Sequence, residues 1–317
     1  MNIVVLDGYT LNPGDLNWKN LEALGECRIY ERTSPDDVVN RSLNAEIILT
    51  NKTPLTGDDI RQLNKLKYIG VLATGYNIVN IEAAKEQNIL VTNVPTYGTD
   101  SVAQQTFAHI LNFTNRVVQH SKSVFNGNWS SSKDWCYWDY PLLELAGLTL
   151  GIIGFGRIGQ AVAQLGLAFG MKILFYDPQQ LAFPENVKKV DLEKLFKESD
   201  IVTLHCPLTD ETEGFVNTDR LKLMKKTAFL INTSRGQLIN EKDLADSLNN
   251  DKIAGAGLDV LPIEPPELND PLLRAKNCFI TPHNSWATKA SRTRLMDAVI
   301  DNLKAFLNHK PKNVVNL

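Results

Sequence analysis

Short apolar runs of strand length alternate with helix-like segments from the first residues of the chain onward. The run "NIVVLDGY" is rich in β-branched residues, and "DLNWKNLEALG" follows it with helical spacing and a terminal Gly25. Similar pairs continue as far as "ILVTNVP", and this first block is complete near residue 99. Repeated strand–helix units with short connections predict a parallel sheet covered by helices on both faces.

The alternation is interrupted once and then starts again. A single long helix is predicted for "TDSVAQQTFAHILNFTNRVVQHSKSVFNG", and the polar, aromatic stretch "NWSSSKDWCYWDYPLLELAG" follows it. The strand and helix patterns resume at "LTLGIIGFG" and continue to "CFITPH", before a final amphipathic helix in "TKASRTRLMDAVIDNLKAFLN". Because 317 residues are too many for one ordinary core, the sequence predicts two doubly wound α/β units.

The composition argues against several classes of protein. A formal net charge of −3 gives no reason to expect nucleic acid or an anionic membrane as a partner. The amino terminus lacks the basic and apolar regions of a signal peptide, and no apolar run approaches the length of a membrane span. Four scattered cysteines without a CxxC pair favour reduced thiols in the cytoplasm and argue against a metal site. A small anionic ligand would need local positive groups.

A glycine-rich loop lies between a predicted strand and a predicted helix. It reads Gly154-Phe155-Gly156-Arg157-Ile158-Gly159, a GxGxxG pattern that is weak alone and specific in this context. Gly154 permits a tight turn, Gly156 lets a pyrophosphate approach the backbone, and Gly159 lets the helix pack close to the strand. The free N–H groups at the start of the helix would bind the phosphates. The pattern predicts a dinucleotide site.

Asp177 ends the next predicted strand, in "ILFYDP". A carboxylate at this place accepts hydrogen bonds from the adenosine ribose and repels a 2′-phosphate, which favours NAD over NADP. Two features oppose this interpretation: Asp177 equally fits a turn before Pro178, and Arg157 would soften the repulsion.

Three ionisable residues follow later strands, at the edge where open α/β sheets bind ligands. Arg235 is always charged, and its planar fork of donors suits a substrate carboxylate and the adjacent carbonyl oxygen. His283 would supply the proton that the alkoxide needs as hydride arrives, while Glu264 would hydrogen-bond the other ring nitrogen and favour the protonated ring. Taken singly, Arg235 also fits a surface or phosphate contact, Glu264 a solvated loop, and His283 a helix cap.

The order of several motifs resembles the D-2-hydroxyacid dehydrogenase family over nearly the whole chain. The motifs are "GIIGFGRIGQAVA", "HCPLTDET", "INTSRGQLIN", "GAGLDVLPIEPP" and "ITPHNSWAT". The resemblance implies that the catalytic trio is Arg235, Glu264 and His283. It also implies a Rossmann NAD-binding domain, residues 100–283, inserted into a flavodoxin-like substrate domain of residues 1–99 and 284–317, with catalysis in the cleft between them.

The resemblance implies further binding residues. At the substrate they are Ala73, Thr74 and Gly75 in "LATGYNIVN", where the backbone N–H groups of the last two would bind the carboxylate. Around the cofactor, besides the glycine loop and Asp177, they are Thr106, His205, Cys206, Pro207, Thr212, Thr233, Ser234 and Asp259. His205 is expected to be a pocket wall rather than a proton donor, and no role is expected for His109, His120 and His309.

The aromatic stretch points to one branch of the family. Together with "HNSWAT" and "RTRLMD", "DWCYWDYPLLELAG" resembles the glycerate dehydrogenase and hydroxypyruvate reductase branch. This implies a homodimer, a dimerisation loop at about residues 120–146, and an aromatic side chain of the loop in the opposing subunit's substrate site. Trp135 and Trp138 are the candidates, although dimer packing explains either one equally well. The expected substrate pair is D-glycerate and hydroxypyruvate, followed by glycolate and glyoxylate.

Alternatives remain open at this point. A D-lactate or phosphoglycerate dehydrogenase would carry the same trio, although many phosphoglycerate enzymes append a regulatory domain. Formate dehydrogenase is disfavoured because it has a glutamine where this chain has Glu264. From a different class, an NAD-sensing co-repressor on the same scaffold would bind partners instead of turning over a substrate.

Overall fold

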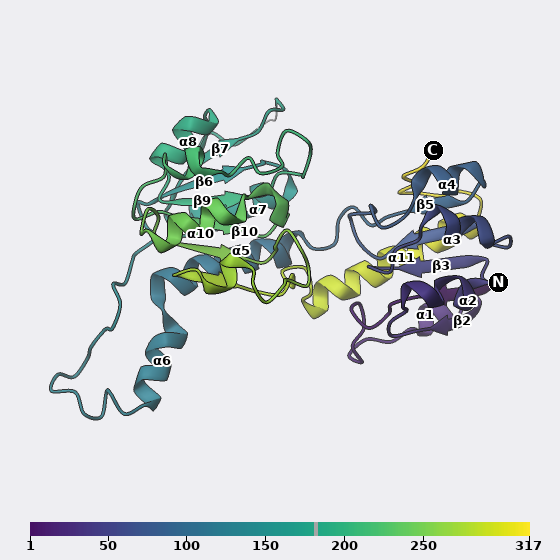
Figure 1. Cartoon of the computed structure of the whole chain (residues 1–317), viewed down its shortest axis with the longest axis horizontal. Coiled ribbons are helices and arrows are strands. Elements are labelled where there is room, and N and C mark those ends of the chain that lie inside the picture. Colours follow the sequence, from purple (N-terminus) through teal and green to yellow (C-terminus); the bar gives the residue numbers. More distant parts are fainter. Residues whose placement is uncertain (181–182) are drawn as a thin grey trace. The chain divides into compact units, whose positions relative to one another are not determined.

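The computed structural model describes residues 1–180 and 183–317 and divides the chain into two compact units. Unit 1 consists of Met1–Gly98 and Ala287–Leu317, and unit 2 of Thr99–Trp286 (Figure 1). Unit 2 is therefore inserted between the two segments of unit 1. The divisions fall a few residues from the expected boundaries at 99 and 283. None of the helices in the described part has the length and apolar character needed to cross a bilayer.

Unit 1 is built on a five-stranded parallel sheet in the order β2-β1-β3-β4-β5, the order of a flavodoxin-like fold. Its strands are β1 (Asn2–Val5), β2 (Glu26–Ile29), β3 (Ile47–Thr50), β4 (Tyr68–Val71) and β5 (Leu90–Thr92). Its helices are α1 (Lys19–Glu22), η1 (Pro35–Asp37), α2 (Val38–Ser42), α3 (Gly57–Gln62), α4 (Ile81–Glu86) and α11 (Lys289–Leu307). The last helix packs on the sheet, where the rings of Phe306 and Tyr68 lie 4.7 Å apart.

Unit 2 is built on a seven-stranded parallel sheet in the order β12-β11-β10-β9-β6-β7-β8. The strands are β6 (Thr149–Ile153), β7 (Lys172–Tyr176), β8 (Val187–Lys189), β9 (Ile201–Leu204), β10 (Phe229–Asn232), β11 (Gly255–Leu258) and β12 (Cys278–Ile280). The helices are α5 (Thr99–Asn115), α6 (Val117–Phe125), α7 (Arg157–Ala168), α8 (Leu192–Glu198), α9 (Thr218–Leu221), η2 (Gly236–Leu238), α10 (Glu241–Asn249) and η3 (Pro271–Arg274). The chain reverses its direction of winding between β6 and β9, which is the Rossmann switch point.

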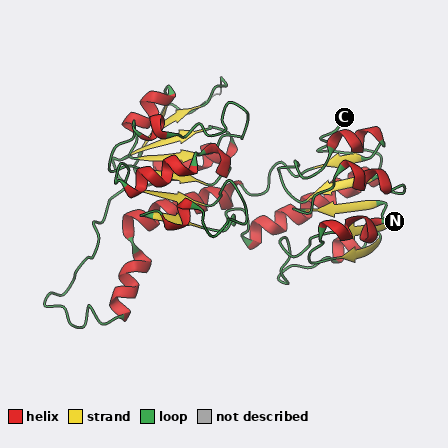
Figure 2. Ribbon diagram, viewed as in Figure 1, coloured by secondary structure: helices red, strands yellow, loops and turns green. Residues whose placement is uncertain are grey.

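Helices cover both faces of the unit 2 sheet (Figure 2). Neighbouring residues of a strand enter separate apolar clusters: Leu230 packs with residues of α8 and α10, whereas Ile231 packs with residues of α5 and α7. Such two-sided burial explains why the strands are continuous apolar runs. The predicted pair of doubly wound parallel α/β units is confirmed.

Two elements differ from the sequence-based expectation. The single long helix is in fact two helices, because Arg116 adopts φ 51° between α5 and α6. Its guanidinium lies 5.2 Å from the ring centroid of Tyr140 and 5.6 Å from that of Phe279, contacts that local periodicity does not reveal. The short strand β8 was not expected either; it lies at the sheet edge and carries Lys188 and Lys189.

Candidate active site

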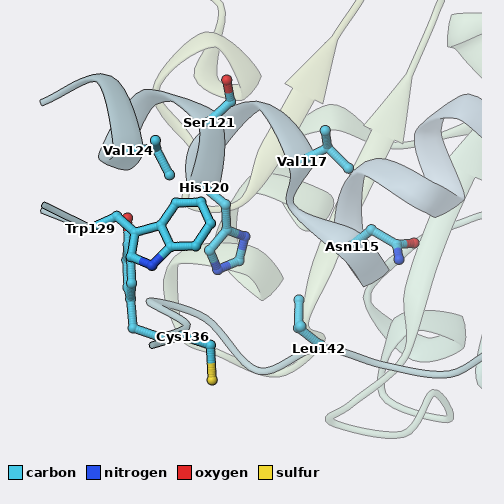
Figure 3. Close-up of a pocket in the computed structure, with 9 residues that line it drawn as sticks. Asn115, Val117, His120, Ser121, Val124, Trp129, Cys136 and Leu142 are labelled. Carbon is cyan, nitrogen blue, oxygen red and sulfur yellow. The ribbon is translucent and has the colours of Figure 1, made fainter. Parts of the chain in front are cut away.

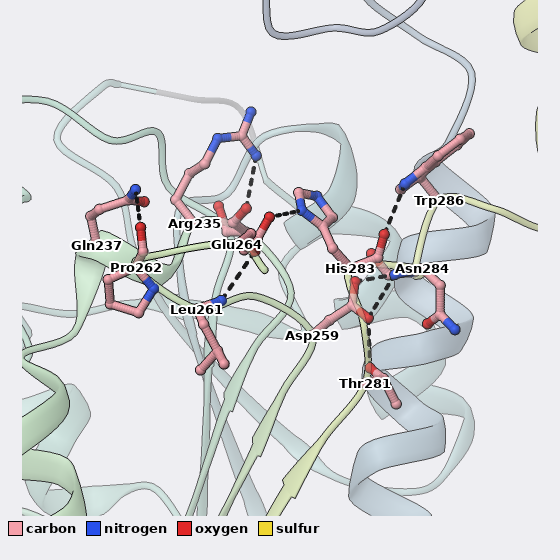
Figure 4. A network of polar contacts seen from close by, with 12 residues as sticks. Arg235, Gln237, Asp259, Leu261, Pro262, Glu264, Thr281, His283, Asn284 and Trp286 are labelled. Carbon is pink, nitrogen blue, oxygen red and sulfur yellow. Dashed lines mark hydrogen bonds and ion pairs between the residues drawn. The ribbon is translucent and has the colours of Figure 1, made fainter. Parts of the chain in front are cut away.

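Three neighbouring strands end at the same level in unit 2. Asn232 of β10 pairs with Leu258 of β11, and Leu258 pairs with Ile280 of β12. The loops that follow these strands therefore leave the sheet side by side at its carboxyl edge, where α/β sheets bind ligands. In chain order the loops carry Arg235, Glu264 and His283 (Figure 4).

The imidazole of His283 is tied to a carboxylate. Its Nδ1 lies 2.6 Å from Oε2 of Glu264, and Oε1 of the same carboxylate accepts a hydrogen bond of 3.1 Å from the backbone N–H of Leu261. The two side chains are 28% and 34% exposed, so a ligand can reach them. Because Nδ1 is engaged with Glu264, Nε2 is the ring atom that can exchange a proton with a bound molecule.

Arg235 is exposed, and a close approach of two loops holds it there. Its Nη1 donates a hydrogen bond of 2.8 Å to the carbonyl of Ser234. A Cβ atom at Gly236 would lie 1.9 Å from the carbonyl carbon of Leu261, so only glycine fits beside Arg235. The small residue next to the arginine thus lets the loop after β10 pack directly on the loop after β11.

The glycine loop after β6 has the geometry of a dinucleotide site. Gly154 has φ 90°, and a Cβ there would lie 2.5 Å from the backbone nitrogen of Cys206. A Cβ at Gly159 would lie 2.2 Å from the carbonyl oxygen of Gly154, whereas a Cβ at Gly156 would meet nothing within 4 Å. The first and third glycines are required by packing, and the second borders open space, which fits a pyrophosphate at the start of α7.

Asp177 at the end of β7 has a structural task as well as the expected binding one. Its Oδ2 accepts a hydrogen bond of 2.8 Å from the N–H of Phe155, and its Oδ1 accepts one of 2.9 Å from the N–H of Gln179. The carboxylate both fixes the glycine loop and begins a turn. The side chain of Phe155 belongs to the core, since it is 1% exposed and stacks on Phe175 at 4.0 Å.

Several other residues implied for the cofactor are brought together. The pairs are the hydroxyls of Thr106 and Thr233 at 3.1 Å, the hydroxyl of Ser234 and the carbonyl of Cys206 at 2.8 Å, and the hydroxyl of Thr212 and the carbonyl of Pro207 at 2.8 Å. The first bond joins the loop after β10 to α5, the second joins the loops after β9 and β10, and the third lies within the loop after β9.

His205 is a neutral buried imidazole. Neither ring nitrogen has a hydrogen-bond partner among the described residues, and burial lowers the pKa of the ring to about 3. A group that stays unprotonated at neutral pH is unsuited to donate a proton to a substrate.

Asp259, one of the residues expected around the cofactor, is only 1% exposed, and both oxygens of its carboxylate accept hydrogen bonds. It accepts hydrogen bonds from the hydroxyl of Thr281 at 2.6 Å and from the backbone N–H groups of Asn284 and Ser285 at 3.0 and 2.9 Å. The residues that flank His283 are therefore held by Asp259. No local pattern in the sequence indicates this role of Asp259.

The loop after β4 in unit 1 presents the expected substrate residues, Ala73, Thr74 and Gly75. The hydroxyl of Thr74 donates to the carbonyl of Val94 at 2.8 Å, and the side chain of Asn93 donates to the carbonyl of Thr74 at 2.7 Å. Within the described residues, the backbone N–H groups of Thr74 and Gly75 donate to no acceptor. They remain available for an anion.

The helix α6 and the loop after it extend away from the rest of unit 2 (Figure 1). We call residues 117–146 the arm. A cavity of about 490 Å³ lies in the arm, and Figure 3 shows Trp129, His120 and Leu142 among its lining residues. Trp135 and Trp138 are 87% and 68% exposed. No site of three or more His, Cys, Asp or Glu side chains for a metal ion occurs in the part of the chain that the structure describes.

With this geometry in view, the chain can be placed among known proteins. It matches the family D-isomer specific 2-hydroxyacid dehydrogenase, NAD binding domain, over residues 107–285, which is more than half of its length. The chain therefore belongs to the D-2-hydroxyacid dehydrogenases and is an NAD-binding enzyme. The predictions of the family, the Rossmann fold and the cofactor are thus confirmed.

The chain is similar over its whole length to individual members of the family. The chain is 52% identical over 321 residues to a hydroxypyruvate reductase of Blautia hydrogenotrophica, with 100% of both chains covered. It is 41% identical over 316 residues to a glycerate dehydrogenase of Methylorubrum extorquens, with 99% of this chain and 98% of the other covered. Among solved structures, a D-lactate dehydrogenase of Aquifex aeolicus complexed with NAD and lactic acid superposes with a TM-score of 0.85 at 31% identity, covering 100% and 99% of the two chains. The hydroxypyruvate reductase and the glycerate dehydrogenase agree with the branch that the aromatic stretch indicated.

Proposed function

We propose that this enzyme interconverts hydroxypyruvate and D-glycerate, and that it also reduces glyoxylate to glycolate. The observation that carries the proposal is the 2.6 Å pair of His283 and Glu264 at the carboxyl edge of a sheet whose switch point holds a dinucleotide loop. The names of the two full-length relatives, a hydroxypyruvate reductase and a glycerate dehydrogenase, support the choice of substrate.

Each residue of the site has a separate role in the proposed reaction. Bound NADH supplies the hydride that reduces the keto carbon. His283 donates the proton from Nε2 to the keto oxygen, and Glu264 stabilises the imidazolium through Nδ1 until the proton leaves. Arg235 binds the substrate carboxylate and polarises the keto oxygen, and the N–H groups of Thr74 and Gly75 bind the carboxylate. In the reverse direction the neutral imidazole accepts the hydroxyl proton.

A panel of keto acids tests the substrate. We expect NADH consumption with hydroxypyruvate to have the highest kcat/KM, followed by glyoxylate, with pyruvate and phosphohydroxypyruvate at least about tenfold lower, because one unfilled or clashing polar contact costs about 1–3 kcal/mol. NADPH in place of NADH should lower the rate, because Asp177 repels the 2′-phosphate. The measurement is absorbance at the nicotinamide band.

Each alternative has its own outcome in this assay. A preference for pyruvate or for phosphohydroxypyruvate would move the chain to the D-lactate or phosphoglycerate type. Turnover of none of the four acids, together with NADH-dependent binding to a protein partner, would favour the co-repressor.

We further propose a cytoplasmic homodimer joined through the arm. The proposal is supported by the exposure of Phe125 (88%), Trp135 (87%) and Trp138 (68%), because so much aromatic surface on one segment is costly in water. Four free thiols fit a reducing compartment. Sedimentation of the purified enzyme should show a dimer. Phe125→Asp should raise the Kd of the dimer by about tenfold or more. A monomer at assay concentration would contradict the proposal.

A further inference from the structure

One face of α5 carries a row of polar side chains. Ser101, Gln105 and His109 follow each other at intervals of four residues, so they lie one above another on the helix. All three contact the segment 281–285, which contains His283. The contacts are Ser101 Oγ to the carbonyl of Ser285 at 2.5 Å, Gln105 Nε2 to Thr281 Oγ1 at 3.4 Å, and His109 Nε2 to Thr281 Oγ1 at 3.2 Å.

The hydroxyl of Thr281 fixes the direction of these hydrogen bonds. It has one proton, which it donates to Oδ1 of Asp259 at 2.6 Å. The same oxygen must therefore act as an acceptor toward His109, which places a proton on Nε2 of that imidazole. A directed chain of bonds thus runs from His109 through Thr281 to Asp259.

Asp259 connects these hydrogen bonds to the backbone around His283. Its carboxylate accepts the N–H groups of Asn284 and Ser285, and its carbonyl accepts the N–H of His283 at 2.8 Å. His283 itself has φ 49°, a left-handed conformation that an L-residue adopts only when its surroundings hold it. The orientation of its ring therefore depends on how firmly this segment is held.

The ring of His109 is buried against β11. The residue is 4% exposed, and a Cβ on Gly257 of β11 would lie 2.9 Å from both the Cβ and the Nδ1 of His109, so the glycine lets α5 and the ring lie close to the strand. Burial lowers the pKa of His109, against the opposing charge of Asp259, so the ring stays neutral in neutral solution and keeps its single donor on Nε2.

We propose that His109 is a positioning residue for His283, acting through Thr281 and Asp259 to hold the segment 281–285 in its strained form. The inference rests on the proposed function, because it assigns His283 as the proton donor. His109 lies on a helix far from His283 in the sequence and touches no group that reacts. Its effect is on the geometry of proton transfer, which a displacement of the ring by about 1 Å impairs.

Two substitutions of His109 separate positioning from packing. His109→Leu removes the donor, whereas His109→Gln keeps an N–H donor the same number of bonds from the backbone. With hydroxypyruvate and NADH, we expect His109→Leu to lower kcat about tenfold with the KM for NADH within about twofold. We also expect a shifted limb in the pH profile of kcat/KM, and recovery of most of both effects in His109→Gln. Thr114→Val, which removes another buried hydroxyl from α5, is the control for a general loss of stability and should leave the kinetics unchanged.

Thr281→Val tests the chain of bonds itself. It should lower kcat about as much as His109→Leu does, and the double variant should be no worse than either one, because both changes break the same chain. Losses that multiply, or a His109→Leu enzyme with wild-type kcat and pH profile, would overturn the inference.

Titration of His283 by NMR, with labelled histidine and without substrate, distinguishes this failure from failure of the proposed function. If the wild-type enzyme reduces none of the keto acids but the His283 titration still moves in His109→Leu, the function is wrong and the positioning stands. If the wild-type enzyme is active and neither the titration nor kcat moves, the positioning is wrong and the function stands.

Discussion

Replacement of His283 by alanine should lower kcat for hydroxypyruvate reduction about a thousandfold, which corresponds to about 4 kcal/mol of lost transition-state stabilisation. The substitution removes the ring whose Nδ1 is held by Glu264 and whose Nε2 would give a proton to the keto oxygen. The affinity for NADH, measured by fluorescence titration, should stay within about twofold of the wild-type value, because the glycine loop after β6 is untouched.

The strained backbone at this position calls for a second variant. His283→Asn removes the imidazole but tolerates the φ of 49° better than alanine does, so it should show the same loss of kcat with less loss of stability. His309→Asn is the matched control, since His309 is exposed in unit 1 and has φ 56°. An enzyme with His283→Asn that keeps more than about a tenth of wild-type kcat would rule out His283 as the proton donor.

Arg235→Gln should lower kcat/KM for hydroxypyruvate by about 10²- to 10⁴-fold, because two charge-assisted hydrogen bonds of about 1.5–3 kcal/mol each are lost. We expect the change in kcat/KM to come from both kcat and KM. KM rises because the carboxylate loses its partner, and kcat falls because the keto oxygen is no longer polarised. Steady-state kinetics at saturating NADH measure both.

A lysine at position 235 separates the effect of the positive charge from the effect of the planar guanidinium. Arg235→Lys keeps the charge but not the planar fork of donors, so it should recover part of the KM effect and little of kcat. Arg274→Gln removes an exposed guanidinium from η3 of the same unit and should leave both constants unchanged. Equal losses in Arg235→Gln and Arg274→Gln would mean that only the general charge of the unit matters.

Much of the cofactor site could be predicted because its signals are local in the sequence. A GxGxxG between a strand and a helix needs only adjacent residues to define its turn, and the structure adds the contact distances at Gly154 and Gly159. Only one of the two structural contacts of Asp177 could be predicted. The residues before Pro178 predict a turn, whereas nothing in the sequence predicts the hydrogen bond from the N–H of Phe155 to the Asp177 carboxylate.

Other features depend on residues that are distant along the chain. The break at Arg116 is accompanied by contacts with the rings of Tyr140 and Phe279, which helical periodicity cannot report. His109 had no expected role, because its partner Thr281 is 172 positions away. The four-residue spacing of Ser101, Gln105 and His109 was a readable signal of a polar helix face, but nothing in the sequence said what that face would meet.

The sequence alone determined most of the order of strands and helices, the glycine loop and the acidic residue after it, because periodicity, chain turns and the chemistry of phosphate binding act over a few neighbouring residues. Tertiary structure alone decided that β10, β11 and β12 end in register and that Gly236 packs on Leu261. It also decided that Asp259 holds the backbone beside His283. These contacts join side chains and loops that only the pairing of distant strands brings within bonding distance.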